Sequence, residues 1–185
     1  NTRTNSMVIG PKILLKLVKE KKLVKNLDKR ELTNPEGAGF DLRFNELYEI
    51  EGNAFLGVKE RQTPTIKQLI GFKKGKKQSI TILPGAFYLM TTIEEVNLPK
   101  DITVNFKPRT TTFRSGLFIR SGNVAPGYKG KLTFAVKNEG PVAVTLEPGC
   151  RIIHAQFQWV DGGGSMYRGQ WQGGRVTTDK KETQV

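Results

Sequence analysis

The chain is poor in the residues that form disulfides and metal centres. Among its 185 residues there is one cysteine, Cys150, and one histidine, His154. A single cysteine cannot form a disulfide within the chain, and a zinc site built from clustered Cys and His ligands is excluded as well. The same scarcity excludes nucleobase deaminases that activate water on a zinc ion, and it favours a reducing, cytoplasmic location.

Long hydrophobic runs are also missing. No apolar stretch approaches the roughly 20 residues that a membrane helix needs, so we expect a soluble protein with no membrane partner. The length and the absence of internal repeats predict that residues 1–185 form a single domain. Residues 1–6 are interpreted as a remnant outside the natural fold, and the glycine-rich residues 161–185 as a flexible C-terminal arm.

Acidic residues are few relative to basic ones. The chain has 17 Asp and Glu against 30 Lys and Arg, a net charge of +13, which indicates an anionic partner such as nucleic acid or a polyphosphate. The densest basic runs are residues 21–30 and 73–77, and the second is predicted to be an exposed hairpin tip. A solubilising surface explains such runs equally well, so nucleic acid is not the favoured partner.

Helical patterns are scarce. Only residues 11–19 carry apolar positions at helical spacing, with Pro11 at the first position, so one short N-terminal helix is predicted. From Leu32 onward the chain consists of short apolar or alternating runs broken by Gly, Pro and Asn. The runs cover residues 40–44, 47–50, 79–85, 87–92, 102–108, 116–120, 131–138, 142–149 and 151–160. This punctuation predicts an all-β domain, closed or double-sheeted.

Six segments occur in the order and spacing of the dUTPase and dCTP deaminase superfamily, which the chain resembles over roughly residues 10–176. The segments are "EGAGFDLRF" (36–44), "LPGAFYLMTTIEEVNLP" (83–99), "PRTTTFRSGLF" (108–118), "APGYKGKLTFAVKNEG" (125–140), "LEPGCRIIHAQF" (146–157) and "YRGQWQGG" (167–174). The resemblance implies a distorted β-barrel of the jelly-roll, β-clip kind, usually a homotrimer with nucleotide sites between subunits. It also implies a pyrimidine deoxynucleoside triphosphate as ligand and Mg²⁺ as cofactor.

Residues 108–114 combine guanidinium groups with hydroxyls, which suit the oxygens of a triphosphate. In the family an Arg-Ser pair followed by a second Arg binds phosphate, and the matching residues are Arg109, Thr110 and Arg114, with threonine in place of serine. A basic edge strand whose threonines serve β propensity is the structural alternative.

Two further segments resemble ligand contacts of the family. Asp41 follows a glycine turn and by resemblance would hold Mg²⁺ through water, although a carboxylate there could equally anchor the turn. Tyr128 resembles the aromatic residue that packs under the deoxyribose and excludes a 2′-hydroxyl; a buried tyrosine filling a barrel corner is the alternative.

The segment "YRGQWQGG" resembles the arm that closes over the nucleotide in this family. Its glycines supply hinge freedom and its aromatic residues supply contact area. The residues that would cover the base and phosphates are Tyr167, Arg168, Trp171 and Gln172.

Alanine stands at two places where the family carries a catalytic carboxylate. The aspartate that activates water in dUTPases corresponds to Ala125, and the glutamate that carries the proton in the family's deaminases corresponds to Ala135. A methyl group cannot accept a proton, and general-base catalysis is worth about 10²- to 10⁴-fold. Glu139 and His154 are candidate substitute bases, although a lone histidine on a strand such as His154 is more often a structural residue.

These observations leave three hypotheses. The family assignment is a dUTP diphosphatase-like enzyme, converting dUTP to dUMP and pyrophosphate, with an altered water-activating group. The alanines favour a second hypothesis, a non-catalytic relative that binds a nucleotide or serves as an interaction protein. A dCTP deaminase is the third and weakest, because it needs a base at the position of Ala135.

Overall fold

The computed structural model describes residues 7–184, so the interpretation of residues 1–6 lies outside the described part of the chain. The helices are α1 (Pro11–Lys21), α2 (Lys29–Thr33) and α3 (Thr110–Arg114). The strands are β1 (Val24–Lys25), β2 (Phe40–Glu51), β3 (Phe55–Leu56), β4 (Glu60–Gln62), β5 (Thr65–Gly71), β6 (Ile80–Ile82), β7 (Phe87–Asn97), β8 (Ile102–Pro108), β9 (Leu117–Arg120), β10 (Lys129–Asn138), β11 (Val144–Leu146), β12 (Arg151–Trp159) and β13 (Glu182–Thr183).

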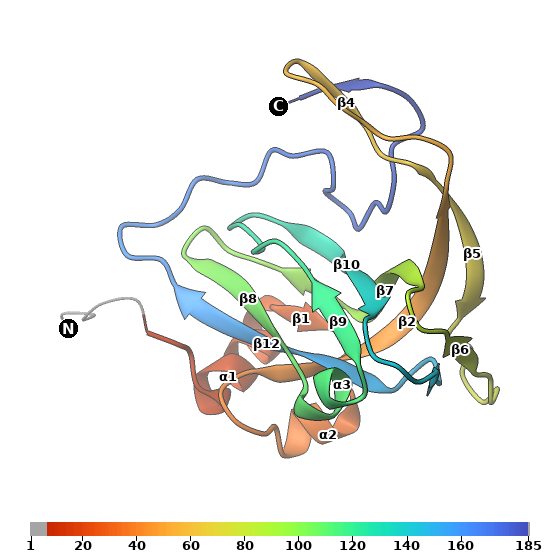
Figure 1. Ribbon diagram of the computed structural model, residues 1–185. Helices are drawn as coiled ribbons and strands as arrows, with labels where there is room; N and C mark the ends of the chain where they lie inside the picture. The colour runs from red at the N-terminus through yellow and green to blue at the C-terminus, as the bar shows by residue number, and fades with distance from the viewer. Residues whose placement is uncertain (1–6, 185) are drawn as a thin grey trace.

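One antiparallel sheet carries most of the fold and confirms the predicted all-β, distorted barrel. Its strand order is β8–β12–β2–β7–β10–β9, with β1 added on β7 and β5 on β2. The sheet curls into a nearly closed barrel (Figure 1). An isolated bridge between Val104 and Val124 links β8 to the segment before β10, so backbone pairing continues across the gap.

Alternating apolar residues explain why the sheet closes around one core. On β10 the side chains of Leu132, Phe134 and Val136 are buried, while those between them are more exposed. Phe40 and Phe157 are fully buried and meet edge to face with ring centroids 6.0 Å apart. Each such side chain contributes roughly 1.5–3 kcal/mol when removed from water, so the core holds the strands in register.

Helix α1 confirms the predicted N-terminal helix and covers one end of the barrel with Leu14 and Leu17 buried. The prediction of a single helix was wrong, because α2 and α3 also form. Each of these has 5 residues, too short for a helical period to stand out in the sequence. No helix within residues 7–184 is long and apolar enough to cross a membrane.

Strands β3, β4 and β13 form a separate three-stranded sheet outside the barrel, at the top of Figure 1. Residues 73–77 are exposed as expected, but they do not form a hairpin tip. They connect β5, which pairs with β2, to β6, which pairs with β11. The runs on either side of residues 73–77 look in the sequence like the two strands of a hairpin. Only the tertiary structure shows that β5 and β6 pair with other strands and not with each other.

Candidate functional site

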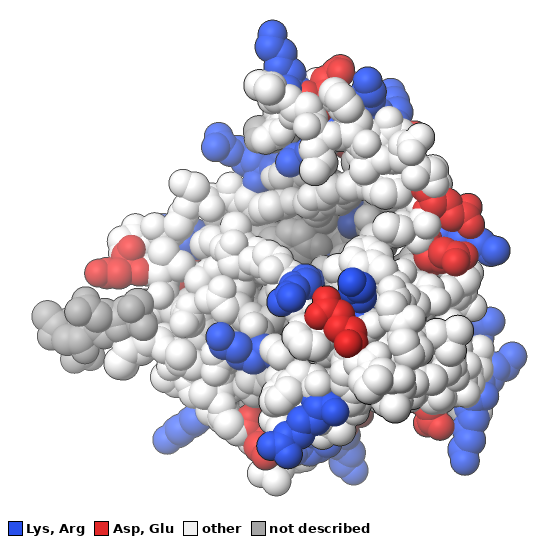
Figure 2. All heavy atoms as spheres, viewed as in Figure 1, with Lys and Arg blue, Asp and Glu red and all other residues white. Residues whose placement is uncertain are grey.

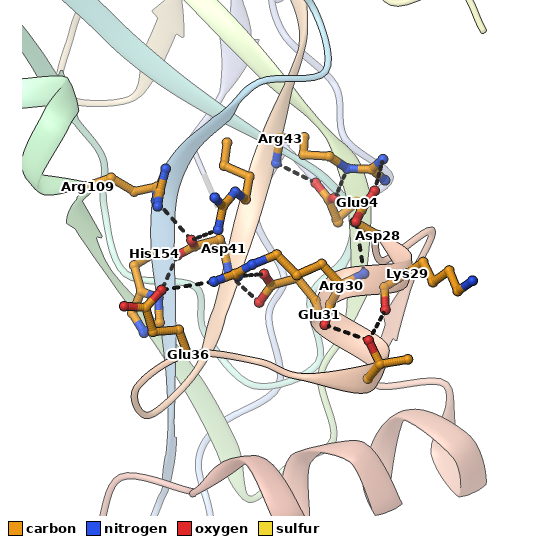
Figure 3. Close-up of polar contacts among 12 residues, drawn as sticks. Asp28, Lys29, Arg30, Glu31, Glu36, Asp41, Arg43, Glu94, Arg109 and His154 are labelled. Carbon is orange, nitrogen blue, oxygen red and sulfur yellow. Dashed lines mark hydrogen bonds and ion pairs between the residues drawn. The ribbon is translucent and has the colours of Figure 1, made fainter.

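A buried carboxylate, Asp41, gathers three basic side chains around it. Its Oδ2 lies 2.8 Å from Arg109 Nε and 3.0 Å from Arg151 Nη1, and its Oδ1 lies 2.9 Å from His154 Nδ1. Figure 3 shows Arg109 and His154 reaching Asp41 from separate elements. We call Asp41, Arg109, Arg151 and His154 the Asp41 cluster.

The backbone explains why these residues meet. Asp41 on β2 stands directly opposite His154 on β12, and Arg109 is the residue before α3. The carboxylate of Glu31 on α2 accepts a hydrogen bond from the Asp41 backbone N–H at 3.0 Å. At Gly39 an added Cβ would lie 2.0 Å from the Ala155 carbonyl oxygen, so only glycine permits this approach of β2 to β12.

The cluster holds Asp41 as an anion. Burial by itself raises the pKa of this carboxyl, but the hydrogen bond from His154 and the charges of Arg109 and Arg151 together bring the pKa below its ordinary value. Both carboxylate oxygens already have cationic or N–H partners. Mg²⁺ prefers several oxygen ligands, and residues 7–184 contain no group of three or more metal-binding side chains. The residues present therefore do not fit a protein-held Mg²⁺.

A second feature, the aromatic pocket, lies between the turn before β10 and the C-terminal segment. It encloses about 450 Å³. Its lining comprises Thr63, Leu89, Phe106, Ser121, Gly122, Asn123, Val124, Ala125, Tyr128, Leu132, Thr133, Phe134, Tyr167, Trp171, Arg175 and Val176. None of these described residues is acidic, and Arg175 is the one charged member of the set. The pocket is suited to a flat, largely apolar group with a few hydroxyl and amide contacts.

Tyr128 forms a fixed wall of the aromatic pocket. Its side chain is largely buried, its hydroxyl donates to the Lys131 carbonyl at 2.6 Å, and its ring meets that of Tyr167 edge to face at 5.3 Å. Burial raises the pKa of Tyr128 to about 12, which keeps the hydroxyl protonated as a donor. Tyr128 is therefore both a buried structural residue, as in the alternative interpretation, and a lining residue of the pocket.

The C-terminal arm lies directly on the Pro126–Lys131 turn. Tyr167 N–H donates to the Pro126 carbonyl at 2.7 Å, and the Gln172 side chain accepts from Lys129 N–H at 2.7 Å. Gly130 has a φ of 137°, and a Cβ there would lie 2.5 Å from the Gly173 carbonyl carbon. Gly130 therefore allows the backbone of the arm at Gly173 and Gly174 to pack directly against the turn. Trp171 lines the pocket, whereas the exposed Arg168 does not.

The two alanines predicted to stand at the family's carboxylate positions have different surroundings. Ala125 lines the aromatic pocket, but Ala135 stands on β10 opposite Leu89 and Arg120 and does not line it.

Neither candidate substitute base reaches the aromatic pocket. Glu139 follows the far end of β10 and lies 3.9 Å from Lys137 Nζ, while His154 is held in the Asp41 cluster. No acceptor side chain with a pKa suited to general-base catalysis therefore lines the pocket in the described chain.

The predicted phosphate-binding residues lie at α3, away from the aromatic pocket. Arg109 is engaged with Asp41, whereas Thr110 and Arg114 are exposed. None of the three lines the pocket, and Figure 1 places α3 and the arm at opposite ends of the barrel. Elsewhere, Lys and Arg are spread over the face in Figure 2 and do not gather in one patch.

A family model described as dCTP deaminase-like matches residues 9–159. The chain belongs to the dUTPase and dCTP deaminase superfamily. It is 30% identical over 156 residues to a dUMP-forming dCTP deaminase of Dictyoglomus turgidum, covering 82% of this chain and 79% of the relative. It is also 30% identical over 166 residues to a probable deoxyuridine 5′-triphosphate nucleotidohydrolase of Methanothermobacter thermautotrophicus, covering 90% and 99%.

A solved structure supports the same fold. The dCTP deaminase of Agrobacterium tumefaciens superposes with a TM-score of 0.64 at 16% identity, covering 84% of this chain and 49% of that one. This superfamily member thus spans about half the length of that deaminase. At this level of identity the likeness describes the barrel and no more.

Several residues of both sites were missed by sequence reasoning. Arg151 stands three residues before His154, and a bulge between Arg151 and Ile153 lets both side chains reach Asp41. The bulge itself has no clear signature in the sequence. Thr63 and Arg175 line the aromatic pocket, yet they belong to an unpredicted hairpin and to the arm.

Proposed function

We propose that the protein binds a pyrimidine deoxynucleoside triphosphate in the aromatic pocket and turns it over slowly or not at all. The observation that carries the proposal is the wall of the pocket at Ala125, where a methyl group stands and no acidic side chain lines the pocket in the described chain. The named relatives are a dUMP-forming dCTP deaminase and a probable deoxyuridine 5′-triphosphate nucleotidohydrolase, which supports pyrimidine deoxynucleotides as the ligand class.

The chemistry of the pocket supports a nucleoside. Tyr128 offers its buried ring to the deoxyribose, and Trp171 offers aromatic area to the base. Ser121, Asn123 and Thr133 supply neutral donors and acceptors for the edge of the base.

The phosphates need more cations than the pocket of a single chain supplies, because its one charged lining residue, Arg175, is already paired with Glu182. Thr110 and Arg114 are exposed on α3, at the other end of the barrel. We therefore propose a homotrimer in which α3 of one copy approaches the aromatic pocket of another. Mg²⁺ would arrive with the triphosphate, and no residue of the described chain is assigned to it.

A nucleotide panel tests the proposal. Titration calorimetry with dUTP, dCTP and UTP, each with Mg²⁺, should show binding of a deoxynucleotide and weaker binding of UTP. Pyrophosphate and ammonia release should both stay far below the usual enzyme range of about 1 to 10³ per second. Turnover within that range would contradict the proposal, and pyrophosphate or ammonia would then identify the reaction as hydrolysis or deamination.

Introducing a carboxylate at residue 125 tests whether the pocket lacks only its general base or has lost the rest of its catalytic geometry as well. Ala125→Asp should raise dUTP hydrolysis, by less than the full general-base factor of about 10²- to 10⁴-fold, because water positioning also depends on neighbouring residues. Ala135→Glu, which lies outside the pocket lining, is the matched control and should release no more pyrophosphate than wild type.

The phosphate assignment and the trimer have their own tests. Arg114→Ala should weaken dUTP binding and reduce its dependence on salt, whereas Arg120→Ala, another exposed arginine, should not. Light scattering should give three times the mass of the chain. A stable monomer, or equal affinity in the two variants, would remove the shared-site model.

A further inference from the structure

The C-terminal arm is paired to a hairpin of its own chain. Strand β13 of the arm runs antiparallel to β4, with Glu182 opposite Arg61 and Thr183 opposite Glu60. Strand β3 completes this small sheet. The hairpin occupies residues 52–64, between β2 and β5, and projects from the barrel beside the arm (Figure 1).

Polar side chains add to the backbone pairing. Arg175 donates through both terminal nitrogens to Glu182, at 3.0 Å and 2.6 Å. Gln170 joins the two sides, because its amide contacts both Arg61 and Glu182. The Lys181 ammonium lies 4.2 Å from the centre of the Phe55 ring.

A reciprocal threonine pair holds the base of the hairpin to the arm. Thr63 N–H donates to the hydroxyl of Thr178 at 3.0 Å, and Thr178 N–H donates to the hydroxyl of Thr63 at 2.9 Å. Thr178 is 1% exposed, so this contact is shielded from water. Thr63 and Arg175, which make these ties, also line the aromatic pocket. The arm cannot leave the pocket until the ties break.

We propose that the 52–64 hairpin is a latch that keeps the arm closed over the aromatic pocket, so that a ligand enters and leaves only when β13 separates from β4. The identity of the ligand rests on the proposed function; the latch itself does not. Release of the latch then sets the rate of ligand exchange.

The latch is the part of the fold suited to open. Leu56 and Val58 at the hairpin tip are 82% and 96% exposed, so the small sheet buries little apolar surface. Regions with few buried apolar contacts open at lower free energy than the barrel strands. Ion pairs such as Arg175–Glu182 also exchange readily with water and salt. The outer sheet can therefore open while the barrel stays folded.

A reversible covalent lock tests the latch. Glu60 and Thr183 are both exposed and stand opposite one another. In the next pair along the ladder, Lys59 and Gln184, the Gln184 N–H donates a hydrogen bond to the Lys59 carbonyl, so that pair is a hydrogen-bonded one. Glu60 and Thr183 are thus a non-hydrogen-bonded pair, with a typical Cα separation of about 4.5 Å that a disulfide can span.

The double variant Glu60→Cys/Thr183→Cys should exchange bound dUTP at least about tenfold more slowly when oxidised than when reduced. The reduced form of the same protein is the control, and Glu60→Cys alone tests for reaction with the half-buried native Cys150. Equal exchange rates in the oxidised and reduced forms would overturn the latch.

Proteolysis tests the latch without a ligand. Glu182→Gln removes the charge that holds Arg175, and trypsin should then cut at Lys180 and Lys181 several-fold faster than in the matched variant Asp161→Asn. If wild type binds no nucleotide, the proposed function fails and this comparison alone decides the latch. The latch stands if Glu182→Gln is cut faster, and it falls if the two variants are cut alike.

Discussion

The Asp41 cluster and the aromatic pocket belong to the same barrel, but they differ in charge and in the segments that hold their residues in place. Asp41 is 5% exposed and pairs with residues on β12 and beside α3, so its partners come from the core framework. The pocket contains no acid, and two of its walls, Trp171 and Arg175, belong to an arm held by an outer hairpin. One region is charged and held by barrel strands, and the other is largely apolar and includes a segment held by an outer hairpin.

This difference separates stability from ligand exchange. A change in the Asp41 cluster leaves either the buried carboxylate or its partly buried arginine partners unpaired and acts on the whole barrel. A change in the arm acts locally, because the outer sheet can open without unfolding the core. The following variants should break or sharpen that separation.

The largest effect is expected from Asp41→Asn. The amide cannot balance the charges of Arg109 and Arg151, so the free energy of unfolding should fall by about 2–3 kcal/mol, somewhat less than for a fully buried pair. Urea unfolding measures the loss. Glu139→Gln, an exposed carboxylate, should stay within about 0.5 kcal/mol of wild type. A similar loss of unfolding free energy in both variants would show that the Asp41 cluster contributes no more to stability than an exposed carboxylate.

Gly130→Ala should act on the arm. The new methyl group would meet the backbone of Gly173 and Gly174, and the positive φ adds strain of about 1–3 kcal/mol. Trypsin should then release the arm faster, while the urea midpoint changes little beyond the strain. Gly75→Ala is the matched control, because Gly75 also has a positive φ but no atom near the added Cβ. Equal arm release in both variants would remove the role of Gly130.

Tyr128→Phe should produce a smaller change. The variant loses the hydrogen bond to the Lys131 carbonyl, worth about 1 kcal/mol, but keeps the ring that meets Tyr167. Denaturant unfolding should detect the loss, while calorimetry should show nucleotide affinity nearly retained. A large loss of affinity would instead place the hydroxyl in contact with the ligand.

The smallest effect is expected from pH. The folded state lowers the pKa of Asp41, so the resulting stability is fully present above the ordinary value of 3.8 and is lost as pH falls through the lower folded value. The effect is small because burial offsets much of the gain from the basic partners. Unfolding from about pH 6 to about pH 3 should show the difference between wild type and Asp41→Asn narrowing by a fraction of the loss expected for that variant at neutral pH. A constant difference between them would contradict this linkage.

Sequence reasoning succeeded where burial imposes a pattern. The runs at 40–44, 87–92 and 131–138 lie within barrel strands and the run at 151–160 covers β12 and one residue beyond it, because one face of each strand packs on the core. It failed for β3 and β4, whose residues are mostly exposed and carry no alternation. The one-turn helices α2 and α3 were missed for lack of length.

The candidate site divides in the same way. Tyr128, Ala125 and the arm residues could be named in advance because they sit at fixed places in short contiguous segments. The separation of α3 from the aromatic pocket could not, because it depends on the path of β9, which lies between the two segments in the sequence and pairs with β10. The trimer, the ligand and the role of Mg²⁺ stay predictions.

The amino-acid sequence by itself determined an all-β domain with one N-terminal helix, since these follow from local alternation and turn residues; the barrel, and alanine at the two carboxylate positions, were implied by the resemblance to the superfamily. Only the tertiary structure decided that Asp41 faces His154, that Gly130 makes room for Gly173, and that the 52–64 hairpin holds the arm. Contacts between residues far apart in the chain depend on strand register and bulges. A shift of one residue in a strand turns every side chain to the other face, and no short segment encodes that choice.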